Sequence, residues 1–237
     1  MDKQHKASID GDQWARCVAQ HGWLWTAAQS GAGAGAPTLI LAHGAGAPMD
    51  SGFMNEMAAR LAAHGVNVLR FEFPYMAQRR LDGGKRPPNP TPRLLECWRE
   101  VYATVRPYVA GRLAIGGKSM GGRMASLLAD ELQADALVCL GYPFYAAGKP
   151  EKPRVEHLAG LKTPALIVQG ERDALGNREA VQGYALSPAI EVMWLVAGDH
   201  DLKPLKASGF SHEQHLEAAA GKVAAFLQSA ICRLPVT

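Results

Sequence analysis

The five residues Gly117-Lys118-Ser119-Met120-Gly121 carry the pattern G-x-S-x-G, and the rest of the chain is interpreted from them. The preceding segment RLAIGG (112–117) is a short apolar run typical of a buried strand. Hydrophobic residues recur at helical spacing after the motif: Met120, Met124, Leu127 and Leu128. The serine is therefore expected at a sharp strand-to-helix turn that exposes its hydroxyl above the carboxyl edge of a sheet, which makes Ser119 a candidate nucleophile.

Small residues surround the serine for a mechanical reason. A turn straight from a strand into a helix strains the nucleophile and brings neighbouring backbone segments together, which Gly117, Gly121 and Gly122 permit. The same letters also end the phosphate-binding pattern G-x-x-x-x-G-K-[ST], but its first glycine would fall on Arg112, and Gly111 is one position out of register. A tight turn with a capping serine is the other alternative.

Apolar segments of strand type recur along the chain, separated by helical patterns. The expected strands are 38–43, 66–73, 112–117, 136–141, 165–170 and 191–198. This alternation predicts an α/β fold with a mostly parallel twisted sheet and helices on both faces. In such a sheet, ligands bind at the carboxyl ends of the strands. We expect a single domain, 1–237, in which residues 1–12 are flexible.

Two local patterns give narrower predictions. WARCVAQ (14–20) and WLWTAAQ (23–29) are separated by His21-Gly22 and have the form of an opening hairpin. Near the end of the chain, Ser211 is followed three residues later by Gln214, which predicts a capping box at the start of the last helix.

Composition restricts the class of protein. The chain has 237 residues, 48% of them hydrophobic, enough for one sizeable core. Its first residues, MDKQHKASIDGDQ, are polar, and nowhere does an uninterrupted apolar run reach the length of about 18 residues that a membrane span needs. We expect a soluble, cytoplasmic protein without a membrane partner. The cysteines form no C-x-x-C pair, which favours buried reduced thiols over a metal site, with disulfides as the alternative for a secreted protein: Cys17, Cys97, Cys139 and Cys232.

A serine hydroxyl needs a neighbouring base, and a carboxylate that orients this base, to act as a nucleophile near neutral pH. After this type of turn the order along the chain is serine, acid, histidine. Asp173 lies just beyond the strand at 165–170 and is our candidate for the acid, with Glu171 in the same loop as the alternative. His200 occupies the loop beyond the final strand, a placement that no other histidine shares. The predicted catalytic residues are therefore Ser119, Asp173 and His200.

Two backbone N–H groups are expected to stabilise the developing oxyanion. Met120, the residue after the serine, is the first candidate donor. The loop His43-Gly44-Ala45-Gly46-Ala47 ends the strand at 38–43, and its small residues let its backbone approach a substrate carbonyl. Ala45 is therefore expected to supply the second donor, with Gly44 as the next choice. This chemistry requires neither a metal nor an organic cofactor.

With these motifs the chain resembles the α/β-hydrolase superfamily over nearly its whole length. Three segments are also similar to bacterial α/β-hydrolases grouped with testis-expressed hydrolase-like proteins and a chromatin acetyltransferase complex subunit, and to dienelactone hydrolases: LAHGAGAPMDSGFM, GGKSMGGRMAS and GYPFYAAGKPEKPRVEHL. The resemblance implies a small hydrolase with little or no cap domain, in a group where some members are scaffolds. Dienelactone hydrolases use a cysteine nucleophile where this chain has Ser119, so dienelactone specificity is not implied.

Two connectors bear on the substrate. About twenty residues, from Tyr142 to Leu161, follow the strand at 136–141, too few for a helical cap, so an open site is expected. Tyr142 and Phe144 either line a pocket for an acyl or alcohol group or simply pack beneath this loop.

The other connector, from Pro74 to Arg93, is basic, while the whole chain has a net charge of only +3. It follows a strand and so emerges on the active-site side. It is either a solvated mobile loop, as charged segments rich in proline and glycine commonly are, or a site where Arg79, Arg80 and Arg86 bind a carboxylate- or phosphate-bearing substrate. Because the positive charge is local, a nucleic-acid partner is not expected.

The sequence as a whole predicts a serine hydrolase that cleaves a small ester or related acyl substrate through an acyl-enzyme. A non-catalytic scaffold for protein binding is the alternative from another class. Acyl transfer, thioesterase and peptidase activities remain open among enzymes, because the same three side chains support all of them. The oligomeric state and the identity of the substrate do not follow from the sequence.

Overall fold

The computed structural model describes residues 11–29 and 35–229. The flexibility expected for residues 1–12 falls outside this part of the chain, except for its last two residues. Residues 11 and 12 are the first two of helix α1 (Gly11–Gln20).

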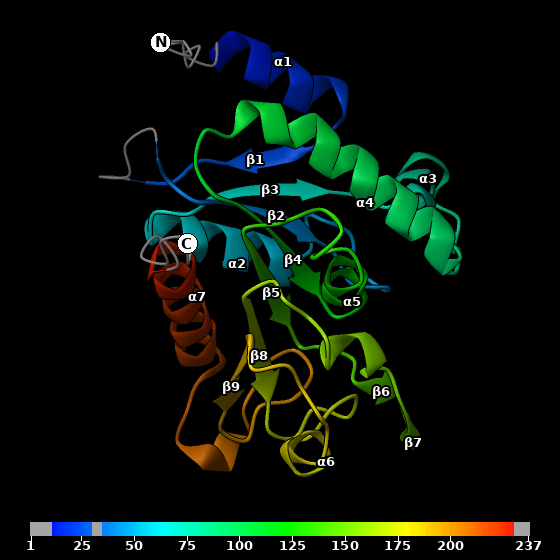
Figure 1. Ribbon diagram of the computed structural model, residues 1–237, viewed down its shortest axis with the longest axis vertical. Helices are drawn as coiled ribbons and strands as arrows, with labels where there is room; N and C mark the ends of the chain where they lie inside the picture. Colours follow the sequence, from blue (N-terminus) through cyan, green and yellow to red (C-terminus); the bar gives the residue numbers. More distant parts are fainter. Residues whose placement is uncertain (1–10, 30–34, 230–237) are drawn as a thin grey trace.

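A seven-stranded sheet runs through the molecule in the order β1-β3-β2-β4-β5-β8-β9 (Figure 1). Its strands are β1 (Leu24–Thr26), β2 (Thr38–Ala42), β3 (Asn67–Phe71), β4 (Leu113–Lys118), β5 (Ala136–Leu140), β8 (Ala165–Gly170) and β9 (Ile190–Leu195). β1 pairs with β3 in the antiparallel sense, and every other pair of neighbours is parallel. All the strands expected from the apolar segments are present, which confirms the predicted fold class.

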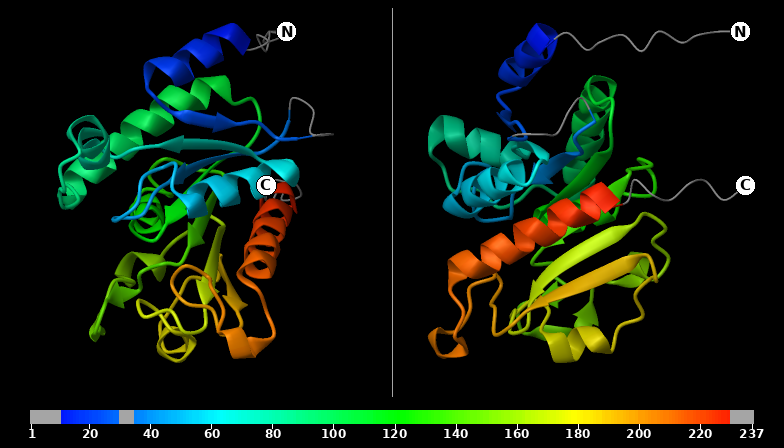
Figure 2. Two further views of the ribbon diagram at one scale, coloured as in Figure 1. Left: turned by 180° about the vertical axis from the view of Figure 1, so that it is seen from behind. Right: turned by 90° about the vertical axis from the view of Figure 1, so that its left-hand side faces the viewer.

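Helices cover both faces of the sheet (Figures 1 and 2). The remaining helices are α2 (Gly52–Ala63), α3 (Pro74–Asp82), α4 (Thr91–Val105), α5 (Met120–Ser126), α6 (Arg178–Gln182) and α7 (His212–Ser229). α2 and α7 lie together on one face, where Met57 and Val223 belong to the same buried cluster as Leu41 of β2. α4 and α5 pack on the other face, where Trp98 and Met124 join a cluster with Ile115 of β4. Each central strand is therefore apolar on both sides, which explains its continuous hydrophobic sequence.

The last helix begins as predicted. The backbone N–H of Gln214 donates to Ser211 Oγ at 3.1 Å, and the backbone N–H of Ser211 donates to Gln214 Oε1 at 2.8 Å. This reciprocal pair satisfies two donors that the helix itself leaves free, so the capping box is confirmed.

The predicted opening hairpin is wrong. Residues 14–20 lie within helix α1, and β1 pairs with β3 instead. Trp14, Cys17 and Val18 are the residues of α1 turned away from solvent, and this spacing of three and four is helical. Gly22, with φ at +64°, stands where the helix ends, so His21-Gly22 terminates a helix rather than joining two strands.

The segment between β5 and β8 contains no helical cap. It forms a small hairpin of β6 (Tyr145–Ala146) and β7 (Lys149–Pro153), followed by one turn of 3₁₀ helix at Glu156–Leu158. The expectation of little or no cap is confirmed. The basic connector is not a mobile loop throughout, as one of its two expected forms required, because its first nine residues form α3.

Other predictions concern the core and the surface. Cys17, Cys97 and Cys139 are buried free thiols, and Cys232 lies outside the described residues.

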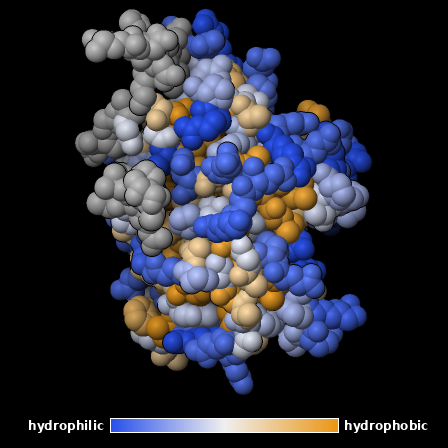
Figure 3. Space-filling model, in the orientation of Figure 1, coloured by the Kyte–Doolittle hydropathy of each residue, from blue (hydrophilic) through white to orange (hydrophobic). Residues whose placement is uncertain are grey.

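In the part of the chain that the structure describes, no helix combines the length and the hydropathy needed to span a membrane. On the face seen in Figure 3, the surface over α3 is mostly hydrophilic.

Candidate active site

Ser119 occupies a strained turn between β4 and α5. Its backbone has φ 51° and ψ −116°, a conformation that residues with a side chain rarely adopt. A Cβ on Gly117 or on Gly121 would lie 2.6 Å from the carbonyl oxygen of Ala42 in β2, so close packing against the neighbouring strand requires glycine at both positions. The backbone N–H of Ser119 donates to Leu140 O of β5 at 3.0 Å, which ties the turn to the strand on the other side.

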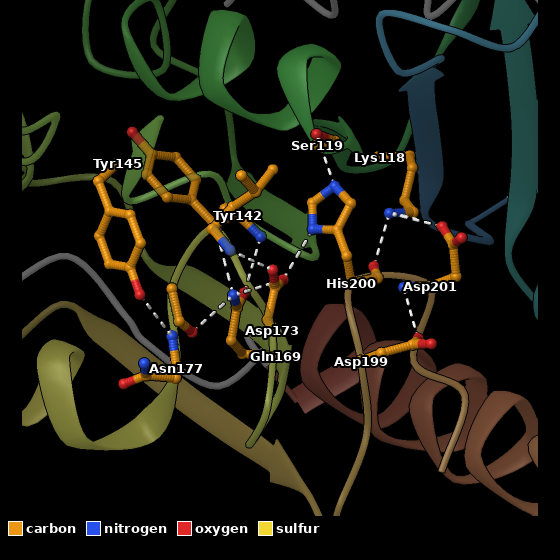
Figure 4. A network of polar contacts seen from close by, with 12 residues as sticks. Lys118, Ser119, Tyr142, Tyr145, Gln169, Asp173, Asn177, Asp199, His200 and Asp201 are labelled. Carbon is orange, nitrogen blue, oxygen red and sulfur yellow. Dashed lines mark hydrogen bonds and ion pairs between the residues drawn. The ribbon is translucent and has the colours of Figure 1, made fainter. Parts of the chain in front are cut away.

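The structure brings the three predicted catalytic side chains into one chain of contacts (Figure 4). His200 Nε2 lies 2.9 Å from Ser119 Oγ, and His200 Nδ1 lies 2.8 Å from Asp173 Oδ2. Asp173 follows β8 and His200 follows β9, so all three stand at the carboxyl ends of parallel strands. The Asp173 carboxylate accepts a hydrogen bond from Nδ1–H, so the ring proton stays on Nδ1 and Nε2 is the acceptor facing the serine.

Glu171, the alternative acid, lies in the same loop but has other partners. Its carboxylate accepts the backbone N–H of Ala197 at 3.0 Å and forms an ion pair with Arg178 at 2.7 Å. Both contacts lower the pKa of Glu171, the Ala197 hydrogen bond most strongly. They hold its side chain between α6 and the segment after β9.

Asp173 is completely buried, and other donors besides the imidazole hold its carboxylate. The backbone N–H of Leu175 donates to Oδ1 at 2.8 Å, and Gln169 Nε2 donates to Oδ2 at 2.8 Å. Gln169 also accepts the backbone N–H of Tyr142 at 2.7 Å. Gln169 was not among the residues predicted for the site, although a single glutamine in the otherwise apolar strand ALIVQG is a signal of a buried polar contact.

Two side chains hold the oxyanion loop, residues 43–47, which was predicted to supply the second N–H donor. His43 Nδ1 contacts Gly44 O at 2.7 Å, while His43 Nε2 accepts the backbone N–H of Phe73 at 3.1 Å. These contacts place the ring proton on Nδ1, and burial lowers the pKa of His43, so the ring is neutral. The Tyr75 hydroxyl donates to Ala45 O at 2.9 Å, and burial raises the pKa of Tyr75 to about 12, which keeps this proton in place.

Fixing these carbonyls also fixes the direction of the amides. In a trans peptide the C=O and the following N–H point in opposite directions, so a Gly44 carbonyl held by His43 turns the N–H of Ala45 the other way. Within the described residues, neither this N–H nor that of Met120, the first residue of α5, is assigned a hydrogen-bond acceptor. Both donors are free for a substrate oxygen, as an oxyanion hole requires.

A cavity of about 340 Å³ opens onto the serine. Its lining comes from the loop after β2, the start of α2, the turn after β4 and the loop after β9: Gly44, Ala45, Gly46, Ala47, Ser51, Phe53, Met54, Lys118, Ser119, His200 and Asp201. A second cavity of about 510 Å³ between α2 and the start of α7 shares Phe53 and Asp201 with the first. The site therefore opens into a longer groove along α2.

A second serine contacts a histidine, with different chemistry. Ser126 Oγ lies 2.8 Å from His157 Nε2, but it also donates to Arg123 O at 2.8 Å. The serine has only one proton, so here the imidazole is the donor. Burial and the nearby Arg123 lower the pKa of His157 to about 4, and no carboxylate contact of this ring occurs among the described residues. Ser126 lacks the base that Ser119 has.

The structure does not place the remaining predicted substrate residues in the Ser119 cavity. Tyr142 and Phe144 are fully buried and pack edge to face with ring centroids 4.8 Å apart, in agreement with the packing alternative. The arginines of the basic connector lie elsewhere: Arg80 pairs with Asp50 and Glu72, Arg86 pairs with Asp82, and Arg79 lines a separate cavity with Arg80. Much of the positive charge expected to attract a substrate is thus neutralised locally. The described residues also contain no group of three or more His, Cys, Asp or Glu side chains placed to hold a metal ion.

Comparison with known proteins places these features in context. Residues 35–228 match a family described as an alpha/beta hydrolase domain. Over 116 residues the chain is 32% identical to a carboxymethylenebutenolidase of Pseudomonas sp. (strain P51), an alignment that covers 47% of this chain and 46% of that protein. The chain therefore matches about half the length of this curated relative.

Two solved structures share the fold over most of both chains. A serine hydrolase without lid from Xanthomonas campestris is 19% identical, with a TM-score of 0.63 over 91% of this chain and 90% of that chain. A dienelactone hydrolase from Anabaena variabilis is 18% identical, with a TM-score of 0.65 over 87% of this chain and 90% of that chain. The absence of a lid in the Xanthomonas protein agrees with a sheet that carries no separate cap.

Proposed function

The chain belongs to the α/β hydrolase family, and from this premise we propose that it is a serine hydrolase that cleaves small carboxylic esters through an acyl-enzyme. The observation that carries the proposal is the unbroken contact from Ser119 Oγ through His200 to the buried Asp173. The relatives named carboxymethylenebutenolidase lend support to ester cleavage as the class of reaction.

In the first half of the proposed reaction, Ser119 Oγ attacks the ester carbonyl while its proton moves to His200 Nε2. Asp173 stabilises the imidazolium that forms, and the N–H groups of Met120 and Ala45 donate to the carbonyl oxygen as it becomes negative. His200 then gives the proton to the leaving alkoxide, so that an alcohol departs and an acyl-Ser119 ester remains.

In the second half, a water molecule takes the place of the alcohol. His200 Nε2 removes a proton from this water, the hydroxide attacks the acyl carbon, and the same two N–H groups stabilise the second oxyanion. The proton then returns to Ser119 Oγ as the carboxylic acid leaves. The open site of this chain, without a cap over the serine, gives water access for this step.

The size of the cavity supports a small substrate. Its volume of about 340 Å³ lies near the lower end of the usual range for ligand sites, roughly 300–1,000 Å³. Its apolar wall is formed by Phe53 and Met54, and longer substituents would extend into the groove along α2. We further place the protein in a reducing compartment such as the cytoplasm, since its three described cysteines are free thiols.

The test is labelling with a fluorophosphonate, which forms a covalent bond only with an activated serine. The wild-type protein should be labelled and should hydrolyse p-nitrophenyl acetate and butyrate, and Ser119→Ala should lose both. Ser126→Ala is the matched control, because Ser126 also contacts a histidine but has no free proton acceptor there. It should keep the labelling. A folded wild-type protein that is not labelled would refute the proposal and favour the non-catalytic scaffold.

A further inference from the structure

Lys118, the residue before the nucleophile, is a buried lysine at the end of β4. Its side chain is 9% exposed and crosses to the loop that carries the catalytic histidine. Nζ donates to the backbone carbonyl of His200 at 2.7 Å and forms an ion pair with Asp201 at 3.1 Å. Figure 4 shows both contacts beside the Ser119–His200 pair.

Lys118 uses two of the three N–H bonds of its ammonium group in these contacts: one goes to His200 O and one to Asp201. The Phe53 ring lies 5.4 Å from Nζ. Both polar partners belong to the loop after β9, so the lysine is bound to this loop.

The packing around Nζ is specific to this arrangement. A Cβ on Gly141, at the end of β5, would lie 2.7 Å from His200 O and 3.2 Å from Lys118 Nζ. The absence of a side chain at Gly141 therefore lets the carbonyl and the ammonium meet. Burial lowers the pKa of Lys118, and the Asp201 carboxylate opposes this effect. A buried charge is costly unless a partner compensates for it, and both partners here belong to the histidine loop.

We propose that Lys118 is a positioning residue for the general base: it fastens the His200–Asp201 backbone to the strand that carries Ser119 and so sets the distance from Nε2 to Oγ. This inference rests on the proposed function, because positioning matters only if His200 acts on Ser119. The position of the loop after β9 is then coupled, through Lys118, to the position of Ser119. Besides this link, the loop is held by its own turn, in which Asp199 accepts the N–H groups of Asp201 and Lys203, and by α7, where His212 Nε2 lies 2.9 Å from Asp201 O and His215 Nδ1 lies 2.9 Å from Leu202 O.

The positive charge also acts on the protonation of the base. Among the described residues, the charged groups near His200 are Asp173 from the loop after β8, Lys118 from β4, and Asp199 and Asp201 from its own loop; the titratable His212 of α7 contacts the Asp201 carbonyl at 2.9 Å. Lys118 opposes protonation of the imidazole, whereas the carboxylates favour it. Removing the ammonium and removing its carboxylate partner should therefore have opposite effects on the pH profile.

The experiment measures the rate of fluorophosphonate labelling against pH for wild type, Lys118→Met and Asp201→Asn. Lys118→Met should react about 10- to 100-fold more slowly, and the midpoint of its acid limb should rise by about half a pH unit or more. Asp201→Asn, whose side chain is 70% exposed and unimportant for packing, should shift this midpoint to lower pH. Lys222→Met is the matched control, since Lys222 pairs with Glu191 away from the site. It should match the wild type in both rate and midpoint.

The outcomes separate the inference from the proposed function. A wild-type protein that is not labelled refutes both. A labelled wild type with a Lys118→Met rate within about twofold refutes the positioning role alone. A slower Lys118→Met variant with an unchanged midpoint indicates general damage and also refutes it. If Lys118→Met fails to fold by circular dichroism, Asp201→Asn decides, and the absence of a downward shift then counts against the inference.

Discussion

Replacing Gln169 by leucine should damage both stability and catalysis, because this buried side chain connects Asp173, the proposed catalytic acid, to the segment after β5. Its carbonyl oxygen accepts the backbone N–H of Tyr142 at 2.7 Å, and its amide donates to Asp173 Oδ2 at 2.8 Å. Leucine has a similar volume but can make neither contact. The change therefore leaves a buried N–H without an acceptor and a buried carboxylate without one of its donors.

Each such group costs about 1–3 kcal/mol, so a loss of about 3 kcal/mol in the free energy of unfolding is expected. For a chain of 237 residues this corresponds to a fall in Tm of roughly 6–12 °C. The remaining donors to Asp173 are His200 and the backbone N–H of Leu175, so the carboxylate stays in place but is free to turn. A misdirected imidazole should lower kcat about 10- to 100-fold with little change in KM.

Differential scanning calorimetry and p-nitrophenyl butyrate kinetics measure these effects. Gln182→Leu is the control, because Gln182 is an exposed glutamine at the end of α6. It should leave Tm within about 1 °C and kcat unchanged, as is usual for surface substitutions. A Gln169→Leu variant with the wild-type Tm and kcat would show that water or a shifted backbone replaces the amide, and the reasoning would then be refuted.

Three further variants have separate readouts. Ser119→Gly should be about 1–2 kcal/mol more stable to urea than Ser119→Ala, because only glycine relieves the strained backbone with φ at 51°; equal stability would contradict the strain. Tyr75→Phe should lower kcat about tenfold at constant KM, since it frees the Ala45 carbonyl of the oxyanion loop. His157, with its pKa lowered from 6.5 to about 4, stays neutral in the folded state while the unfolded chain takes up a proton, so stability falls as the pH drops from about 6.5 to 4. Between pH 7 and pH 4.5, the free energy of unfolding measured with urea should fall by about 1–2 kcal/mol less in His157→Gln than in the wild type. The difference is smaller than the full pKa shift would give, because the ring is partly exposed.

The parts of the fold that the sequence predicted are those in which one physical requirement dominates. A strand covered on both faces must be apolar throughout, so segments such as 136–141 and 165–170 were found with nearly the observed bounds. The turn at Ser119 requires glycine where strands approach, and that requirement produces a recognisable motif. Parallel strands end at one edge, which is why Asp173 and His200 were correctly expected to lie near the serine.

The errors arose where two patterns overlap over a short stretch. Seven residues of WARCVAQ are too few to separate a helical period from a strand, and the single buried stripe of α1 became visible only against the sheet edge. The ion pairs of the basic connector could not be predicted, because a run of charged residues in the sequence does not show which carboxylates lie beside it in the fold. Asp50 and Glu72 are distant from Arg80 along the chain, yet both reach its guanidinium in the fold.

The supporting position of Lys118 could not be predicted from the sequence, because it depends on which side of the sheet the side chain faces. Along β4, alternate residues face opposite sides of the sheet: Ile115 belongs to the cluster under α4 and α5, and Ala114 to the cluster under α2 and α7. Lys118 has the parity of Ala114, so its side chain turns toward α2 and meets the Phe53 ring there. The loop after β9 passes over this same side, which brings the His200 carbonyl within reach of Nζ. A motif records which residue types are needed at the turn, but only the parity of the strand and the path of a distant loop decide that this lysine supports the base.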